Sequence, residues 1–600
     1  MRAASSGLEA ARAAIRDATF ADEGTCLSHL ADAARLKAEA RDRAVGKAAD
    51  LVRKVRSASS PGLMETFLSE YGLSTDEGIA LMCLAEALLR VPDAETIDAL
   101  IEDKIAPSDW GKHLGRSSSS LVNASTWALL VTGRVLDEPG RGLAGALNGA
   151  LKRLGEPVIR AAVAEAMRRL GRQFVLGETI QSALKRAAGM EAKGYTYSYD
   201  MLGEAARTFA DAERYRLAYE QAIAAIAEQA NGDDPRRNPG ISIKLSALHP
   251  RYESAQKESC VAALVPIVAA LARQAKAGGL GLNIDAEEQD RLDLSLDVIE
   301  QVAGDPTLDD WQGFGVVVQA YGRRALPVIE WLDALSQTIG RTIMVRLVKG
   351  AYWDTEIKRA QVLGTQTFPV FTRKAGSDVS YMACARALLD KAGRLYPQFA
   401  THNAHTVAAV MEMANGEDFE FQRLHGMGEA LYEVVRADTP VKCRIYAPVG
   451  AHEDLLAYLV RRLLENGANS SFANQIVNQA VPPHKVAADP FATLQKAPPV
   501  NARLRQPPDL FAPTRRNAKG WDLAEPVAFA AFDTARAPNN AKRFAAAPIT
   551  VSNVAPQDPQ DVANPARPSD AVGTVRNIDP DAAATVVRDG AQGVRWASPK

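Results

Sequence analysis

Residues 343–350 read Ile-Met-Val-Arg-Leu-Val-Lys-Gly, a short β-branched and apolar run that carries one arginine and ends on Lys-Gly. Such a run, followed by an amphipathic helical pattern, is typical of a buried strand in an α/β protein. Similar runs, each followed by an amphipathic helical pattern, occupy residues 195–201, 241–245, 280–285, 316–320, 398–402, 420–424 and 443–448. Together they predict a (β/α)8 TIM-like barrel rather than an open doubly wound sheet, whose expected Gly-rich turn is missing.

The fold class is therefore α/β, with an all-α region before the barrel. Residues 1–194 are rich in Ala, Leu and Arg at helical spacing, which predicts a helical arm and an α-domain. The predicted barrel occupies residues 195–478. Residues 479–570 are rich in proline, so we expect a linker there. Residues 571–600, with a short helix predicted at 579–597, indicate the beginning of a further domain.

The composition is that of a soluble globular chain. A net charge of −2 over 600 residues gives no electrostatic footprint for nucleic acid, so we expect no nucleic-acid partner. The five cysteines are scattered and never spaced as Cys-x-x-Cys, which argues against a disulfide framework or a zinc site and favours a reducing cytoplasm. No uninterrupted apolar run approaches the roughly 20 residues that span a bilayer, so any membrane contact is expected to be peripheral.

Polar residues stand at or just beyond the ends of most predicted strands. The carboxyl ends of the strands in such a barrel meet on one rim, where the active sites of these barrels lie. One charged residue at a strand end usually marks only the start of a loop, but several that converge on one rim favour a site. These residues are Glu204, Lys244, Asp285, Gln319, Arg346, His402 and Tyr446.

One helical stretch after the last predicted strand carries Tyr458, Arg461, Arg462 and Glu465, spaced so that they share one face. Two guanidinium groups offer planar forks of donors and a fixed charge, which suits a small carboxylate. The alternative is a solvated face on which an arginine pairs with Glu465. Because this helix follows the eighth predicted strand directly, we favour a carboxylate clamp over the barrel mouth.

Six motifs follow one another along the barrel region: Ser-Ile-Lys-Leu-Ser-Ala-Leu-His-Pro-Arg-Tyr (242–252), Ile-Asp-Ala-Glu-Glu (284–288), Val-Arg-Leu-Val-Lys-Gly-Ala-Tyr-Trp-Asp (345–354), Phe-Ala-Thr-His-Asn (399–403), Leu-His-Gly-Met-Gly (424–428) and Tyr-Ala-Pro-Val-Gly (446–450). In this order they resemble the proline dehydrogenase domain of the bacterial bifunctional proline utilization A flavoenzymes. The resemblance implies FAD-dependent oxidation of L-proline to Δ1-pyrroline-5-carboxylate, with electrons passed to a membrane quinone.

The resemblance also implies roles for single residues. Asp285 and Arg346 are expected in the catalytic centre, with Arg346 donating toward the flavin N5 region. Proline has one carboxylate and an apolar ring, so cationic donors and aromatic or aliphatic walls suit it. The residues expected to contact proline are Lys244, Leu347, Tyr352, Tyr446, Tyr458, Arg461 and Arg462. The residues expected to contact FAD are Ala286, Gln319, Arg346, Lys349, Gly350, Ala351, Trp353, Thr372, Lys374, Thr401, His402, Asn403 and Glu465.

Two other functions compete with this interpretation. His402 and His405 on a barrel rim raise the possibility of a metal-dependent hydrolase. The second predicted strand ends in Lys244 rather than in a His-x-His pair, and too few further ligands converge, so we expect no metal. A helical scaffolding protein with a vestigial barrel is the other alternative.

Both ends of the chain depart from the largest family members. The chain opens directly in the helical arm, without their short ribbon-helix-helix DNA-binding module, so we expect no repressor role. Residues 574–600 resemble only the entry to an NAD-dependent aldehyde dehydrogenase half. We therefore expect a sequence cut short inside a longer polypeptide that would oxidise glutamate semialdehyde to glutamate. We also expect a cytoplasmic homo-oligomer, with peripheral contact at the inner face of the cell membrane.

Overall fold

Eight parallel strands close into a barrel in the order of the sequence, with the first strand paired to the last. They are β1 (Thr196–Met201), β2 (Gly240–Ile243), β3 (Gly281–Ile284), β4 (Phe314–Gln319), β5 (Ile343–Val348), β6 (Leu395–Ala400), β7 (Glu420–Leu424) and β8 (Lys442–Val449). This arrangement confirms the predicted (β/α)8 barrel. β6 begins earlier than predicted. The difference arises at Pro397, which lies inside the strand opposite Val345. A proline has no N–H to donate to a neighbouring strand, so its presence in the sequence argues against a central strand.

This computed structural model describes part of the chain, namely residues 2–58, 175–451, 458, 461, 472–550 and 553–593. Residues 59–174 of the predicted α-domain lie outside the described residues, as do Arg462 and Glu465 of the arginine helix. The chain divides into two compact units, Met1–Ala524 and Glu525–Lys600.

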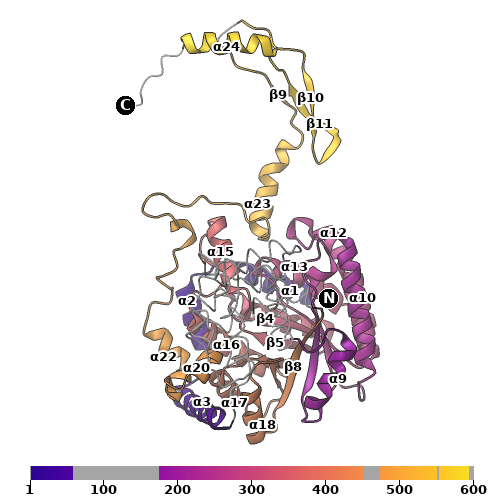
Figure 1. Ribbon diagram of the computed structural model, residues 1–600, viewed down its shortest axis with the longest axis vertical. Helices are drawn as coiled ribbons and strands as arrows, with labels where there is room; N and C mark the ends of the chain where they lie inside the picture. The colour runs from indigo at the N-terminus through magenta and orange to yellow at the C-terminus, as the bar shows by residue number, and fades with distance from the viewer. Residues whose placement is uncertain are drawn as a thin grey trace, which may run out of the picture. The chain divides into compact units, whose positions relative to one another are not determined.

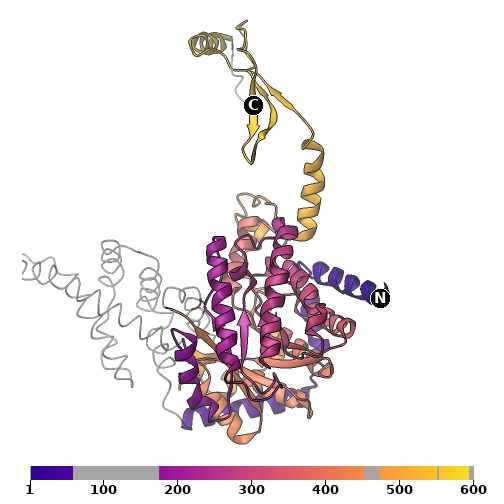
Figure 2. The ribbon, with the colours of Figure 1, turned by 90° about the vertical axis from the view of Figure 1, so that its right-hand side faces the viewer.

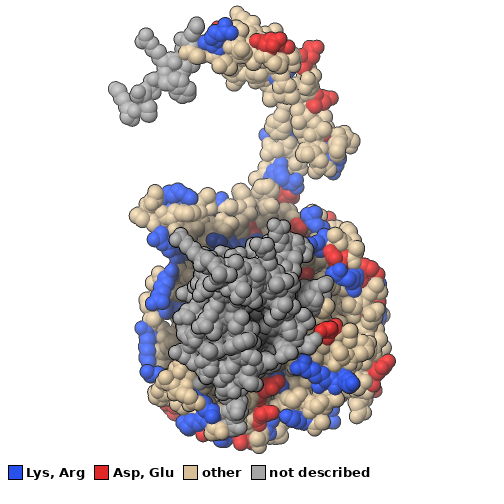
Figure 3. All heavy atoms as spheres, viewed as in Figure 1, with Lys and Arg blue, Asp and Glu red and all other residues tan. Residues whose placement is uncertain are grey.

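Helices surround the barrel on its outside (Figures 1 and 2). They are α9 (Ile180–Glu191), α10 (Phe209–Ala227), α12 (Lys257–Ala277), α13 (Leu292–Ala303), α14 (Ala325–Ile339), α15 (Trp353–Leu363), α16 (Lys374–Asp390), α17 (Ala404–Ala414) and α18 (Glu429–Asp438). Helix α10 starts with a capping box in which Thr208 and Asp211 satisfy each other's backbone N–H groups. Lys and Arg side chains and Asp and Glu side chains both occur on the face of the barrel unit in Figure 3, as the small net charge implies.

Among the described residues, one helix is long and apolar enough to cross a membrane, at residues 254–277. It includes α12, which packs against α10 and α13 of the outer layer. Its apolar residues Cys260, Leu264, Val268 and Leu271 are buried in the barrel unit. A helix in the outer layer of a barrel passes the same test, so the hydropathy of α12 is weak evidence for a membrane span.

Polar side chains fill the barrel near the amino ends of its strands. The Glu420 carboxylate, 1% exposed, accepts hydrogen bonds from Gln398 Nε2 at 2.9 Å, Gln422 Nε2 at 2.7 Å and Arg444 Nε at 2.8 Å. Arg444 Nη1 also donates to the carbonyl oxygen of Asn238 at 2.7 Å. These bonds join strands β6, β7 and β8 and form the floor of the barrel.

The N-terminal arm consists of α1 (Arg2–Asp17), α2 (Glu23–Ala33) and α3 (Ala38–Ala58), which pack on α14, α16 and α17 respectively. Two ion pairs with buried members fasten it to the barrel. Arg12 pairs with Asp293 at 3.1 Å, and Glu23 pairs with Arg323 at 3.3 Å. The predicted helical arm is thus present in residues 2–58.

The Pro-rich segment 479–570, expected to be a linker, contains regular elements instead. They are α21 (Pro483–Val486), α22 (Pro490–Gln495), α23 (Pro526–Arg536), β9 (Phe544–Ala546), β10 (Gln560–Asn564) and part of β11 (Arg567–Val575). Three of its prolines stand at the first position of α21, α22 and α23, where the missing N–H is not needed, so they start helices rather than break them. In the second unit β11 pairs with β9 and β10, and α24 (Pro580–Gly593) lies within the helix predicted at 579–597.

Glu420→Gln should lower the free energy of unfolding by roughly 3 to 5 kcal/mol, because it removes the charge that balances buried Arg444. It also replaces one carboxylate oxygen, an acceptor, by an amide NH2 group, which is a donor. Chemical denaturation measures this change. Asp50→Asn, which removes one partner of an exposed pair with Arg53, is the control and should leave stability nearly unchanged. Equal small effects of both substitutions would contradict a floor held by Glu420.

Candidate active site

A cavity of about 300 Å³ lies at the carboxyl ends of the strands. Most of the residues that were predicted to form the site line it. These are Lys244, Asp285, Ala286, Gln319, Arg346, Lys349, Gly350, Ala351, Tyr352, Lys374, Thr401, His402, Asn403, Tyr446, Tyr458 and Arg461. The structure therefore brings most of the predicted substrate and cofactor residues together at one barrel mouth.

Arg346 projects from β5 into the barrel and is 3% exposed. Its Nε donates to Gln422 at 2.6 Å, and its Nη2 donates to Ser198 at 3.1 Å. Its Nη1 donates to Ser242 and to Asp285 Oδ1, both at 2.9 Å. A guanidinium has five N–H groups, so these contacts leave one for a bound molecule. The protein therefore fixes the position of this cation before any ligand arrives.

Tyr446 joins two carboxylates at the cavity. Its hydroxyl oxygen lies 2.6 Å from Asp200 Oδ2 and 2.7 Å from Asp285 Oδ2. One hydroxyl carries one hydrogen, so Tyr446 lies between two carboxylates that compete for the same donor. Burial raises the pKa of Asp285, against the charges of Lys244 and Arg346.

Lys244, just beyond β2, completes this group. Its Nζ lies 2.7 Å from Asp200 Oδ1 and 3.7 Å from Asp285 Oδ2. Burial alone would lower the pKa of Lys244, but the charges of Asp200 and Asp285 outweigh burial and hold this pKa well above its ordinary value. Lys244 and Arg346 thus place two cations beside Asp200 and Asp285 at the inner part of the cavity.

Arg461 forms a bidentate ion pair with Glu204, which lies in the loop between β1 and α10. Its Nη1 and Nη2 each lie 2.7 Å from one oxygen of Glu204. Its guanidinium carbon also lies 5.2 Å from the centre of the Tyr352 ring. Burial tends to raise the pKa of Glu204, but the hydrogen bonds and charge of Arg461 outweigh it, and the pKa lies below its ordinary value. The partner of Arg461 is therefore a residue of the barrel rim.

Two lysines form a second cationic region in the cavity. Lys349 and Lys374 both bind the carboxylate of Asp378, Lys374 at 2.7 Å. Burial would raise the pKa of Asp378, but the two lysines outweigh burial and hold it well below its usual range. Gly350, with a φ of +127°, has no room for a side chain, since a Cβ would lie 2.4 Å from the Tyr321 ring. Paired cations beside a glycine backbone that lines the cavity fit a diphosphate.

Among the residues predicted to contact proline or FAD that the structure describes, three do not line the cavity. Leu347 neighbours inward-pointing Arg346 in β5, so strand alternation turns it to the apolar layer outside the barrel. Trp353 donates its Nε1–H to the Phe371 carbonyl at 2.8 Å. The N–H and hydroxyl of Thr372 both donate to Glu23 of the arm, at 2.7 and 2.9 Å.

Some lining residues were not among the predicted ones. Asp200 ends the run Tyr-Ser-Tyr-Asp, so the rule that polar residues at strand ends form the site identifies it. Gln422 lies in the interior of β7 and carries no comparable signal. The other such residues are Val317, Val348, Ala400, Arg423, Leu424 and Phe472.

The two histidines behind the metal hypothesis are engaged in other ways. His402 Nε2 accepts a hydrogen bond from the Leu424 N–H at 3.0 Å, which occupies the lone pair that a metal would need. Burial lowers the pKa of His405 to about 4. No group of three His, Cys, Asp or Glu side chains within the described parts of the chain could hold a metal ion. These contacts give no support to the hydrolase alternative.

Comparison with known proteins places this geometry in a family. The family model described as proline dehydrogenase matches residues 183–475, and the model described as the proline utilization A proline dehydrogenase N-terminal domain matches residues 9–56. A third model, described as the DNA-binding domain of proline dehydrogenase, matches residues 63–174. The third match conflicts with the predicted absence of a nucleic-acid partner, and that prediction is withdrawn.

Several relatives resemble nearly the whole chain. The bifunctional protein PutA of Salmonella typhimurium is 48% identical over 94% of this chain, and that of Rhizobium meliloti is 50% identical over 94%. A crystal structure of a Bradyrhizobium japonicum proline utilization A mutant, 48% identical, superposes with a TM-score of 0.69 over 88% of this chain and 53% of its own. The chain spans only 44% and 46% of the two curated relatives. Residues 183–475 of this chain belong to the proline dehydrogenase family, and the chain as a whole spans about half the length of the PutA proteins that it matches.

Proposed function

We propose that the barrel oxidises L-proline to Δ1-pyrroline-5-carboxylate with FAD as the bound oxidant and a membrane quinone as the final electron acceptor. The observation that carries this proposal is one cavity with two separate cationic regions. Lys244, Arg346 and Arg461 surround its inner part, and Lys349 and Lys374 lie in the other. A small carboxylate substrate and a diphosphate cofactor need these two kinds of region.

Arg461 and Lys244 suit the proline carboxylate. Glu204 occupies one N–H on each of the two terminal nitrogens of Arg461, so further N–H groups stay available for a second carboxylate. Tyr352, Tyr446 and Tyr458 supply the walls for the apolar ring. The ion pair with Glu204 orients the guanidinium, which lowers the entropic cost of binding the substrate.

Lys349 and Lys374, the second cationic region of the cavity, fit the diphosphate of FAD. The family consists of flavoenzymes in general, and FAD is the flavin whose diphosphate these two lysines suit. When bound, the flavin supplies the hydride acceptor. Arg346, with one N–H left, stabilises negative charge that develops beside it.

Proline must lose its amine proton before its ring carbon can give up hydride. Asp200 and Asp285 both lie at the cavity in contact with the Tyr446 hydroxyl, and a carboxylate of this group can accept the proton of the substrate ammonium. Asp285 also keeps Arg346 in place through its Oδ1. Asp285 thus contacts both the Tyr446 hydroxyl and the Arg346 guanidinium.

The relatives carry the printed name of bifunctional proteins, and this chain covers under half of their length. We infer that, within such a longer polypeptide, the product passes on toward glutamate in an NAD-dependent step. Peripheral contact with the cytoplasmic face of the membrane and a homo-oligomeric state belong to the same proposal, since the quinone acceptor resides in the bilayer.

The proposal predicts that the chain, reconstituted with FAD, turns over L-proline with a soluble quinone. Product formation and quinone reduction should occur in equal amounts. The same preparation given NAD and Δ1-pyrroline-5-carboxylate should reduce no NAD. A reconstituted protein that binds FAD and fails to oxidise proline would contradict the proposal.

Arg461→Met should raise the KM for proline far more than it lowers kcat, because a carboxylate contact exists in both ground and transition states. The loss of a charge-assisted bond in an enclosed site is worth roughly 2 to 4 kcal/mol, or about 30- to 1000-fold in kcat/KM. Arg461→Lys should recover only part of this. Steady-state kinetics measure the effect.

Arg251→Met, which removes an exposed arginine paired with Glu253, is the matched control and should leave both constants unchanged. Flavin content should stay constant in all three variants. A proline KM within about twofold of the original in Arg461→Met would show that this arginine is no clamp.

Lys349→Met should weaken FAD binding roughly 10-fold, because the variant loses a cation of the diphosphate region. Titration of the flavin-free chain with FAD, followed by flavin fluorescence, gives the Kd. Lys358→Met changes an exposed lysine of α15 and serves as the control. Equal FAD affinity in the two variants would argue against the assigned diphosphate site.

A further inference from the structure

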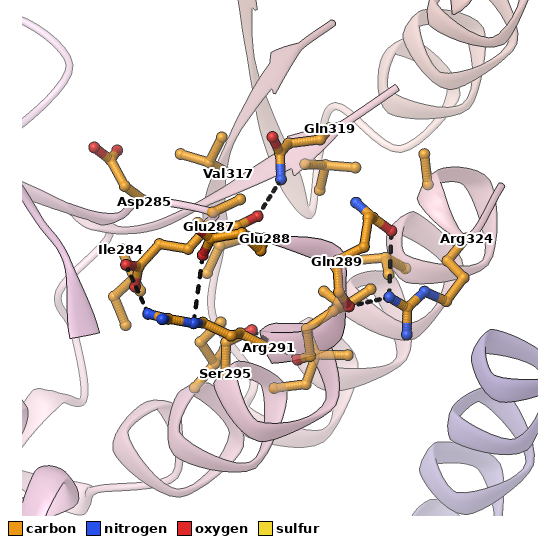
Figure 4. Close-up of a pocket in the computed structure, with 18 of the residues that line it drawn as sticks. Ile284, Asp285, Glu287, Glu288, Gln289, Arg291, Ser295, Val317, Gln319 and Arg324 are labelled. Atoms are coloured by element: carbon orange, nitrogen blue, oxygen red, sulfur yellow. Dashed lines mark hydrogen bonds and ion pairs between the residues drawn. The ribbon is translucent and has the colours of Figure 1, made fainter. Parts of the chain in front are cut away.

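The loop between β3 and α13 carries a buried carboxylate that the proposed reaction does not use. Glu287 has a side chain that is 6% exposed. Its Oε2 accepts the Ser246 N–H at 3.1 Å, and its Oε1 accepts the Ser246 hydroxyl. Figure 4 shows Arg291 and Gln319 directed toward the same loop, where Gln319 Nε2 donates to the Glu287 carbonyl at 2.7 Å.

Ser246 in turn holds the loop between β1 and α10. Its hydroxyl oxygen accepts the Ala205 N–H at 2.9 Å, and its carbonyl oxygen accepts the Ala206 N–H at 2.9 Å. The serine hydroxyl can accept from Ala205 while it donates to Glu287, so the two bonds support each other. A continuous chain of hydrogen bonds therefore runs from the β3 loop to the β1 loop.

The loop that Ser246 holds is strained. Ala205 has a φ of +50°, in the left-handed region that a residue with a Cβ disfavours. Such a conformation persists only where surrounding contacts fix it. The residue before it is Glu204, whose carboxylate meets Arg461 at 2.7 Å. The direction of the Glu204 side chain thus depends on a turn in which the next two residues, Ala205 and Ala206, both donate their N–H groups to Ser246.

We propose that Ser246 and Glu287 are positioning residues for the Glu204–Arg461 pair. They hold Ala205 in its left-handed conformation and thereby direct Glu204 at the arginine. The consequence for proline binding rests on the proposed function, because it assumes that Arg461 binds the substrate carboxylate. The control of the turn does not rest on that function.

Glu287 offers Ser246 two acceptor oxygens, whereas a glutamine of the same size offers one. Both of its oxygens are needed, one for the N–H and one for the hydroxyl of Ser246. Arg291 Nη1 lies 3.5 Å from Oε1, so the arginine leaves both bonds to Ser246 intact. Burial raises the pKa of Glu287 to about 7, against the charge of Arg291 and the bond from Ser246. The ionised form of the Glu287 carboxyl is therefore stabilised by Arg291 and by the hydrogen bonds from Ser246.

The first test uses hydrogen exchange in the FAD-reconstituted chain. Ser246→Ala removes the acceptor of the Ala205 N–H, so the peptide that covers residues 202–208 should exchange roughly 10-fold faster. Glu287→Gln, which keeps one acceptor oxygen, should give a smaller increase. Ser295→Ala is the matched control, because the Ser295 hydroxyl bonds the Leu292 carbonyl within α13. Exchange that is unchanged in Ser246→Ala would overturn the proposal.

The second test uses kinetics. Ser246→Ala should raise the proline KM about 5- to 10-fold with kcat within about twofold, since it acts on a binding contact. In a Glu204→Gln background the same change should shift KM less than about twofold, because its effect passes through Glu204. Ala205→Gly, which removes the strain, should restore the KM of Ser246→Ala.

Additive effects of Ser246→Ala and Glu204→Gln would overturn the proposal, since they would mean that Ser246 acts by another route. An original chain that does not oxidise proline would refute the proposed function instead. Hydrogen exchange would then still decide whether Ser246 and Glu287 control the turn.

Discussion

The buried guanidinium of Arg346 is the charge that the rest of the barrel must balance. An isolated cation inside a protein is costly, so the groups around it must supply both counter-charge and hydrogen-bond acceptors. Its acceptors are Ser198 of β1, Ser242 of β2, Asp285 beyond β3 and Gln422 of β7. Only a closed barrel brings the inner faces of these strands within reach of one side chain.

The same network joins the floor of the barrel to its mouth. Below Arg346, Gln422 leads to Glu420, which Arg444 neutralises. Above it, Asp285 leads through Tyr446 to a second carboxylate and a lysine at the cavity. Buried ion pairs add little net stability against an apolar core, but they fix charges in place. A cationic site set before the substrate binds is what electrostatic catalysis requires.

The periodicity of the sequence was enough for the number of strands and the closed barrel, because these depend on local patterns. The common rim of parallel strands explains why strand-end residues such as Lys244, Arg346 and Tyr446 meet in the cavity. Most other lining residues were expected from the family resemblance. The sequence could not predict which side chains pair with one another across the fold. Arg461 pairs with Glu204, which lies 257 residues away, and spacing along one helix could not show this. Thr372 was assigned to the cofactor, whereas its polar groups meet Glu23 of the arm. Asp200 was overlooked, although its strand-end position is a usable signal.

The central claim is that one barrel mouth holds a flavin and proline in contact, with Arg346 at the junction. The most direct test mixes the FAD-reconstituted chain with L-proline in the absence of oxygen and of any acceptor, and follows the visible absorption of the flavin. The account predicts that the yellow colour bleaches, with one flavin reduced for each proline consumed, and that added quinone restores it. A flavin that is bound yet keeps its colour in saturating proline would contradict the account.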